Sequence, residues 1–196
     1  MSSDQIKTRT RILVSTQKLL ETNPTKAVRM SDIAKDAGLS RQALYLHFPT
    51  RSELLIATTR YLDEILNVDQ RLVPSRVAEK GTDRLRLYIE AWGNYIPEIY
   101  SVGRALMAVQ DTDDAAKAAW EGRMQAVREG CLAVVKQLKA DGDLVPELST
   151  KQATDVLWGL VSVRMWEHYI QSCKWSQKRY IEVTHQIARQ VLLGHA

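Results

Sequence analysis

Apolar residues recur at spacings of three and four along most of this 196-residue chain, and that spacing restricts the folds open to it. It gathers apolar side chains on one face of an α-helix, whereas the strict alternation of a half-buried strand is scarce here. Residues 4–22 and 113–140 give the longest such stretches. The sequence therefore predicts an all-α fold of about nine helices.

Residues 31–47 predict two short helices joined by a tight turn. Ser31 can cap the first helix and Ser40 the second, because a side-chain oxygen can accept from the first turn of backbone N–H groups. Gly38 supplies the positive φ that the turn requires. Pro49 ends the second helix, since the residue before a proline avoids the α region. This pattern is a helix-turn-helix, whose second helix enters the DNA major groove.

Polar side chains are expected on the outer face of that second helix. Arg41 and Gln42 lie at the end that faces base edges, where arginine can pair with guanine and glutamine with adenine. Tyr45 and His47 suit phosphate contacts, which position a protein without reading sequence. Two alternatives stay open: Tyr45 packing on the surface, and His47 acting as a partner of the helix dipole.

Basic residues are concentrated near the N-terminus. Residues 1–60 hold ten Lys and Arg against five Asp and Glu, a net charge of +5 within a chain total of +4. Charge alone fits a solvated surface equally well. Beside a helix-turn-helix, it indicates a DNA-binding module.

The motif Ile33-Ala34-x-x-Ala37-Gly38-Leu39-Ser40, then Leu44-Tyr45-x-His47-Phe48 and Glu53-Leu54-Leu55, resembles the signature of the tetracycline-repressor (TetR) family over residues 10–58. The resemblance implies a homodimer with a three-helix DNA-binding head at residues 1–51. It also implies a larger helical body at 52–196 that senses a ligand and dimerises, and a helix from about residue 52 that connects the two. The expected DNA-contacting residues are Lys7, Arg11, Ser31, Ser40, Arg41, Gln42, Tyr45, His47 and Arg51.

Within that resemblance, Lys7 and Arg11 match a basic N-terminal arm, and His47 and Arg51 match backbone-contacting positions. The chain departs from the family pattern at three places. Arg29 stands where a small hydroxyl cap is usual, and Ser31 where a basic residue is common. Residues 23–26 also replace the Gly-aromatic pair that often follows the first helix.

Further helices are expected at about 82–96, 97–107, 113–140, 150–171 and 176–193, after a boundary segment at 70–82 that contains Pro74 and Gly81. The stretch 153–170 is apolar around nearly its whole circumference, which is typical of a helix buried on every side. With the last helix, it is predicted to form a four-helix dimer interface.

Aromatic and sulfur-containing residues of the body predict an apolar pocket with a few polar groups. Plain core packing is the alternative for each residue. The candidate pocket residues are Trp92, Tyr95, Tyr100, Met107, Trp120, Met124, Trp158, Arg164, Met165 and His168. Arg164 is the least expected in an apolar helix, and it could pair with a ligand anion or with a carboxylate across the dimer.

The sequence thus predicts a ligand-responsive repressor that binds an inverted-repeat DNA operator and is released by a small apolar or aromatic effector. A ligand-independent, nucleoid-associated factor on the same fold is the alternative. No phosphate loop, metal-ligand cluster or nucleophile motif is found, so neither an enzyme nor a cofactor is expected. Reduced, partly buried Cys131 and Cys173 fit the cytoplasm, and no signal peptide or membrane span is expected.

Overall fold

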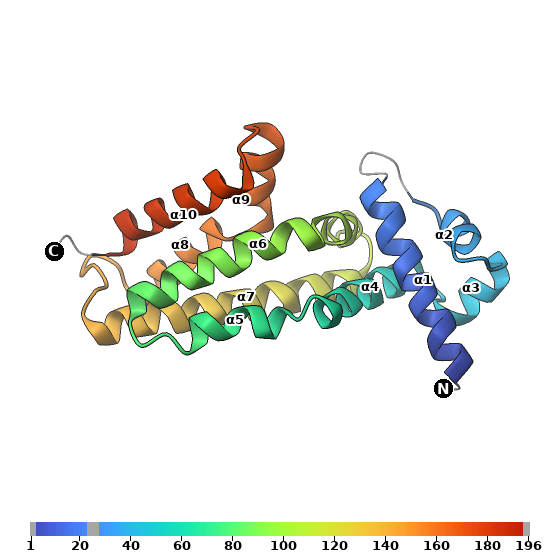
Figure 1. Ribbon diagram of the computed structural model, residues 1–196, viewed down its shortest axis with the longest axis horizontal. Helices are drawn as coiled ribbons and strands as arrows, with labels where there is room; N and C mark the ends of the chain where they lie inside the picture. The colour runs from blue at the N-terminus through green and yellow to red at the C-terminus, as the bar shows by residue number, and fades with distance from the viewer. Residues whose placement is uncertain (1–2, 23–27, 194–196) are drawn as a thin grey trace. The chain divides into compact units, whose positions relative to one another are not determined.

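The computed structural model describes residues 3–22 and 28–193, and it confirms the all-α fold (Figure 1). Its elements in chain order are α1 (Ser3–Thr22), α2 (Met30–Asp36), α3 (Arg41–His47), α4 (Arg51–Ile65), α5 (Val68–Arg76), α6 (Gly81–Met107), α7 (Asp114–Asp141), α8 (Thr150–Leu160), α9 (Val163–Glu167), the π-turn η1 (His168–Ser172) and α10 (Gln177–Leu192). Within the described residues no helix is both long and apolar enough to cross a membrane.

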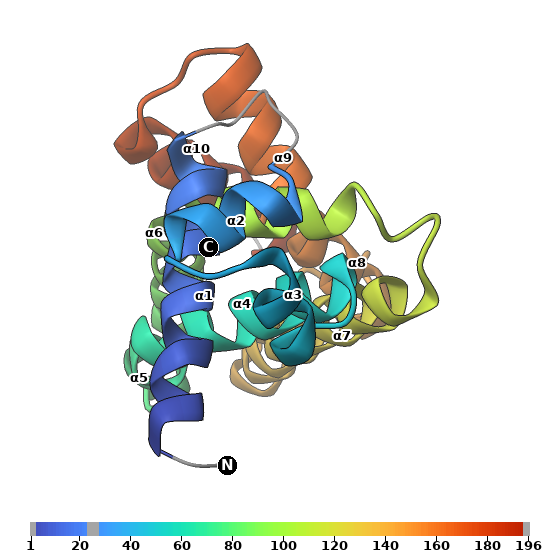
Figure 2. The same cartoon turned by 90° about the vertical axis from the view of Figure 1, so that its right-hand side faces the viewer.

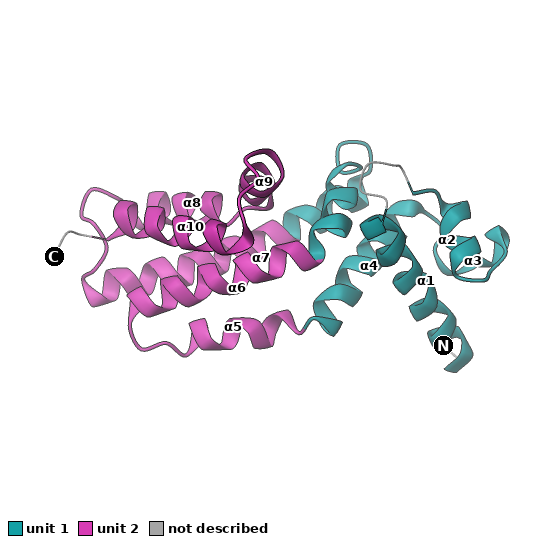
Figure 3. Ribbon diagram, turned by 45° about the horizontal axis from the view of Figure 1, so that its top comes forward, with its two compact units in different colours: residues 1–66, 99–122 teal, residues 67–98, 123–196 magenta. Residues whose placement is uncertain are grey.

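Two compact units make up the chain, and the first, called the head unit, holds residues 1–66 and 99–122 (Figure 3). In it α1 packs against α2 and α4, and α2 packs against α3 (Figure 2). Leu44 of α3 and Leu54 of α4 are fully buried in its core. The end of α6 and the start of α7 belong to the same core, through Val102, Leu106 and Ala116.

The second unit, called the body unit, holds residues 67–98 and 123–196. Leu85 and Ile89 of α6 pack there with residues of α7, α8 and α10. The buried Tyr88 hydroxyl donates a hydrogen bond of 2.8 Å to the Val127 carbonyl, which fixes α6 against α7. The expected domains, a DNA-binding head at residues 1–51 and a sensing body at 52–196, are divided by function, whereas the two units are divided by packing. The functional division stays a prediction.

Helix α6 corrects the expectation of two helices that meet at Pro97. The helix continues through Pro97, which is exposed and lies inside it. A proline removes one backbone hydrogen bond but does not prevent burial on the opposite face. Tyr95 and Ile96 before it and Val102 after it are each 1% exposed, and this packing holds the helix together.

The single helix expected over residues 153–170 is also wrong. Helix α8 ends at Leu160, and the Ser162 hydroxyl caps a new helix by accepting from the Met165 N–H at 3.2 Å. Serine competes for backbone groups in this way, and so it favours a helix start over a helix interior. The π-turn η1 follows, with Arg164 and His168 exposed at the surface.

Three smaller expectations also need correction. The boundary segment 70–82 is largely helix α5, with Pro74 inside it. Ser52 is a residue type that could cap α4, but the cap is Thr50 and Ser52 is buried. Both cysteines are free thiols, as expected, but Cys131 is buried and Cys173 is exposed. Asn23 and Pro24, expected to end the first helix, lie outside the described residues.

Gly81→Ala is expected to destabilise the body unit by about 1–3 kcal/mol. A β-carbon at Gly81 would lie 2.8 Å from the Leu138 backbone nitrogen and 2.9 Å from its Cα, which cannot move aside as a side chain can. Urea unfolding followed by circular dichroism measures the loss.

The matched control is Gly122→Ala, whose β-carbon would meet nothing within 4 Å. This substitution in a helix should be neutral or stabilise by about 0.4–1 kcal/mol. An unchanged unfolding midpoint for the Gly81 variant would contradict the close approach of α6 and α7.

Candidate nucleic-acid interface

Helices α2 and α3 form the predicted helix-turn-helix within the head unit. Gly38 adopts a φ of 66°, the left-handed conformation that the turn requires. The Leu39 N–H donates to the Ala34 carbonyl at 2.8 Å and closes the turn. The Ser40 hydroxyl accepts from the Ala43 N–H at 3.1 Å, which confirms Ser40 as the cap of α3.

Helix α2 is capped differently from the expectation, because its N-cap is Arg29 and not Ser31. The Asp32 carboxylate accepts from the Arg29 backbone N–H at 3.1 Å, which is the half of a capping box that the third helical residue supplies. Ser31 is left exposed in the first turn of α2. Its exposure is compatible with the DNA contact expected of it, which stays a prediction.

Helix α3 has a buried face and an outer face. Leu44 is fully buried, and Phe48 directly after the helix is 1% exposed, so these two side chains fix the helix to the head core. Arg41 and Gln42 are exposed on the outer face. The Arg41 guanidinium lies 5.5 Å from the centre of the half-buried Tyr45 ring, which orients both side chains on this face.

An arginine that the sequence analysis did not select secures the end of α3. Arg9 of α1 donates a hydrogen bond of 3.0 Å to the His47 carbonyl, and its guanidinium lies 4.1 Å from the centre of the Phe48 ring. A cation at a helix C-terminus also complements the helix dipole. Arg9 therefore positions the recognition helix from inside the head.

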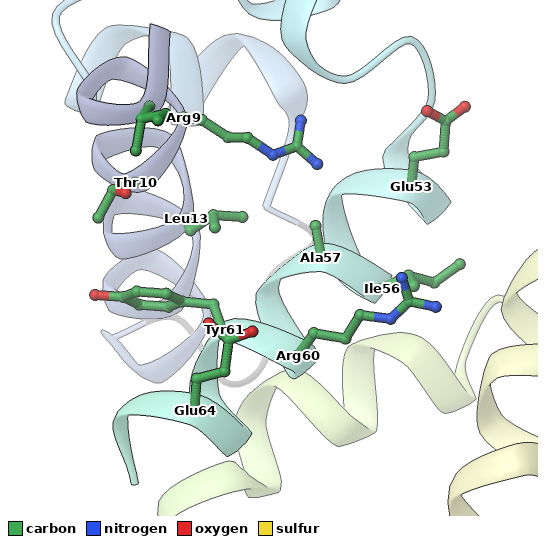
Figure 4. A pocket seen from close by; sticks show the side chains of 10 residues that line it. Arg9, Thr10, Leu13, Glu53, Ile56, Ala57, Arg60, Tyr61 and Glu64 are labelled. Carbon is green, nitrogen blue, oxygen red and sulfur yellow. The ribbon is translucent and has the colours of Figure 1, made fainter. Parts of the chain in front are cut away.

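Figure 4 shows Arg9 reaching into a groove between α1 and α4. Leu13 of α1 and Ala57 of α4 line the same groove, which has a volume of about 450 Å³. Tyr61 reaches across it from α4 (Figure 4). Arg9 also links this groove to the His47 carbonyl of α3 and to the Phe48 ring directly after that helix.

The remaining predicted contacts fall into two groups. Lys7 and Arg11 are exposed, and they lie on helix α1 rather than on an extended arm. His47 and Arg51 are half-buried. Arg51 donates to the Val28 carbonyl, and partial burial lowers the pKa of its guanidinium, which still stays protonated at neutral pH.

An ion pair joins α1 to α2 on the surface of the head unit. The Lys18 ammonium lies 2.7 Å from the Asp36 carboxylate. Hydrogen bonds from Lys18 and then Ser15 lower the pKa of Asp36. Lys18 is thus engaged within the head, whereas Lys7 and Arg11 are exposed on the same helix.

A cavity of about 300 Å³ lies in the body unit between α5, α6 and α7. The Trp92 indole N–H is buried there with no acceptor among the described residues, whereas the Ser75 hydroxyl donates to the Arg84 carbonyl. The lining residues are Leu72, Ser75, Arg76, Arg84, Tyr88, Trp92, Ala126, Glu129, Gly130, Ala133 and Val134.

Of the predicted pocket residues, Trp92 lines this cavity and the others do not. The Tyr95 ring packs edge to face on the Trp92 ring, with 5.7 Å between the ring centres. Tyr95 itself is buried in the core. Met124 and Trp158 pack against the body core. Tyr100, Met107 and Trp120 belong to the head unit, and Arg164, Met165 and His168 lie on α9 and η1.

Tyr88, which lines the cavity, and Cys131, whose Sγ lies 3.8 Å from the Tyr88 hydroxyl, both stay protonated at neutral pH. Burial raises the pKa of Tyr88 far above its usual value. Burial likewise raises the pKa of the Cys131 thiol to about 12, so it stays protonated at neutral pH. Among the described residues no cluster of three or more His, Cys, Asp or Glu side chains could hold a metal ion.

Comparison with known proteins points to one family. Residues 12–58 match the model of bacterial regulatory proteins of the tetR family. The HTH-type transcriptional regulator EthR of Mycobacterium tuberculosis is 29% identical over 122 residues, which cover 58% of this chain and 53% of EthR. The nucleoid occlusion factor SlmA of Shewanella baltica is 33% identical over 64 residues, which cover 33% of this chain and 32% of SlmA.

The chain thus spans about half the length of the EthR relative that it matches. Among solved structures, a protein from Saccharomonospora viridis, described as a transcriptional regulator and solved in complex with choline, superposes with a TM-score of 0.82. That match covers 96% of this chain and 99% of the other at 14% identity, so it shows a shared fold.

Arg9→Ala and Arg11→Ala should separate positioning from phosphate contact. The Arg9 variant loses its hydrogen bond and its contact with Phe48, which should lower the free energy of unfolding by about 1–2 kcal/mol and weaken DNA binding. The exposed Arg11 variant should keep its stability and reduce the slope of log affinity against log salt by about 1.

Thermal unfolding and fluorescence anisotropy with labelled duplex DNA at several salt concentrations provide the measurements. A wild-type affinity that did not change with salt would contradict the predicted phosphate contacts. Full stability of the Arg9 variant would contradict its role in holding α3.

Proposed function

Because this chain belongs to the TetR family of bacterial regulatory proteins, we propose that it is a DNA-binding repressor of transcription that works as a cytoplasmic homodimer. The observation that carries the proposal is the recognition helix α3. Its Leu44 is fully buried, while Arg41 and Gln42 are exposed on the outer face. The fold thus presents two side chains suited to base edges on a helix whose position is fixed.

Each recognition helix would read part of one half-site. Arg41 would donate to the O6 and N7 acceptors of guanine, and Gln42 would pair with adenine. Ser31, Ser40, Tyr45, His47 and Arg51 lie on or beside the helix-turn-helix, and they would contact phosphates around the same groove. Lys7 and Arg11 of α1 would add sequence-independent contacts with the backbone.

Dimerisation would use α8 and α10. Val191 of α10 is 40% exposed, and Trp158 and Leu160 of α8 are half-buried in the single chain. A partner subunit related by a two-fold axis would cover these apolar side chains. Two recognition helices about one DNA turn apart would then read an inverted repeat.

The cavity between α5, α6 and α7 would receive a small apolar or aromatic effector. Tyr88 and Trp92 offer aromatic surface, and Arg76 and Arg84 offer positive charge. The buried Trp92 N–H has no acceptor within the part of the chain that the structure describes. A ligand with an aromatic or aliphatic body and an acceptor group fits this lining. The related fold solved in complex with choline is a precedent for a small ligand in such a protein.

Effector binding would release DNA only if the ligand favours one arrangement of the two heads over another. Helix α6 is a suitable transmitter, because Tyr88 and Trp92 line the cavity and Val102 of the same helix is buried in the head core. Helix α4, which follows the recognition helix directly, would pass the change on. This family regulates transcription, so the cavity is proposed for sensing and not for catalysis.

A ligand-independent role on the nucleoid is the second candidate, and the match to SlmA supports it. That match covers 64 residues. Both candidate classes, the ligand-responsive repressor and the ligand-independent nucleoid factor, have a DNA-binding head of this kind. The head therefore cannot distinguish them, and the distinction has to come from the body unit. The lined cavity in the body favours the ligand-responsive repressor.

Arg41→Ala should weaken binding to an operator duplex selected with the wild-type protein from a random pool. The loss should be about 5- to 150-fold, because one good base contact contributes about 1–3 kcal/mol of discrimination. The substitution should also relax the preference for one base pair. Gel-shift titration against operator and scrambled duplexes measures both effects. The control is Lys139→Ala, an exposed body residue whose loss should leave operator affinity unchanged. Wild-type affinity in the Arg41 variant would overturn the assignment of α3.

Ala133→Phe should abolish effector response and leave DNA binding intact. Ala133 lines the cavity and is half-buried, so an added ring would fill space that the effector needs. The assay adds a panel of apolar and aromatic compounds to the protein bound to labelled operator, and it measures DNA release by anisotropy. The wild-type protein is expected to release the DNA when the effector is added, and the variant is expected to keep it bound. Equal release of DNA by the wild type and the variant would show that the effector binds elsewhere.

A further inference from the structure

Leu46 is the most exposed large apolar side chain among the described residues. It is 81% exposed, compared with 70% for Val77, the next in order. Unlike Val77, which follows helix α5, Leu46 lies on the recognition helix α3. Burying a leucine side chain is favourable, so a helix that leaves one in water is suited to an apolar contact outside the head.

The position of Leu46 on α3 places it beside Gln42. Residues four apart on a helix are neighbours on its surface, and a leucine side chain leans toward the preceding turn. Arg41 and Tyr45 form a second pair at the same spacing, joined by the cation–π contact at 5.5 Å. The outer face therefore consists of two adjacent pairs, Arg41 with Tyr45 and Gln42 with Leu46.

DNA offers one apolar group to a helix in its major groove, the 5-methyl group of thymine. The net charge of +5 in residues 1–60 favours DNA as the occupant of this face over an apolar protein surface. Gln42 is exposed next to Leu46, and glutamine is a partner for adenine. The two side chains together suit an adenine and a thymine methyl at the same base pair or at adjacent base pairs.

We propose that Leu46 reads a thymine in each half-site by packing against its 5-methyl group. This inference rests on the proposed function as a sequence-specific DNA-binding protein. It adds an apolar determinant to the polar contacts of Arg41 and Gln42. A half-site read in this way requires thymine at one defined position, where cytosine or uracil is discriminated against.

The test combines removal of the leucine with removal of the methyl group. Duplexes that bind the wild-type protein are first selected from a random pool. Each thymine of the selected half-site is then replaced in turn by deoxyuridine, which lacks only the methyl group. At one thymine per half-site, replacement should weaken wild-type binding by about fourfold, the contribution of one buried methyl-sized group. Leu46→Ala should bind the thymine duplex more weakly and lose its sensitivity to that replacement.

Val77→Ala is the matched control, because it shortens another exposed apolar side chain away from α3. It should keep the wild-type sensitivity to deoxyuridine. The Leu46 variant should unfold at the wild-type temperature, since the side chain packs against little of the head. Circular dichroism checks this before binding is measured.

The outcomes separate the two proposals. If no sequence is enriched in the selection, the proposed function fails. If a sequence is enriched but no deoxyuridine replacement weakens binding, or if Leu46→Ala keeps the wild-type sensitivity, the thymine reading is wrong while the proposed function stands. Unchanged DNA binding with a change in oligomeric state for Leu46→Ala would instead show that a protein surface covers this leucine.

Discussion

Burial of Leu44 and Phe48 is the constraint on which the recognition helix depends. A helix of seven residues is too short to be stable in water by its own hydrogen bonds. Both side chains lie in the head core with residues of α1, α2 and α4, and Arg9 holds the end of the helix through the His47 carbonyl. Because the inner face and the end of the helix carry its stability, the outer face can vary with the DNA that it reads.

The head core is completed by residues far along the chain. Val102 and Leu106 of α6 and Ala116 of α7 are buried in the same cluster as Leu44. Trp92, which lines the body cavity, and Val102, which is buried in the head core, both belong to helix α6. If the proposed effector moved α6, the packing of Val102 and Leu106 in the head core would change with it.

The helix-turn-helix of the head can be predicted from the sequence because its signals are local. Contacts between residues far apart in the chain cannot be predicted in this way. Gly38 predicts a turn and Ser40 predicts a helix cap, each from its own residue type and its immediate neighbours. The structure has both features. The role of Arg9 was missed because its partner, the His47 carbonyl, is 38 residues away. In the sequence Pro97 indicates a helix end, but α6 continues through it. Burial of the residues on either side of Pro97 holds the helix together, and the sequence does not show which residues bury them.

The cavity was the hardest feature to predict, because composition identifies aromatic residues but not the direction in which each one faces. Trp92 and Trp120 look alike in sequence, yet one lines the body cavity and the other packs against the head core. Small residues such as Gly130 and Ala133 shape the cavity as much as the rings do, and they carry no signal of their own. The head is thus specified by a short motif shared across a family, whereas the chemistry that the body would sense is set by faces of α5, α6 and α7 that meet only in the folded chain.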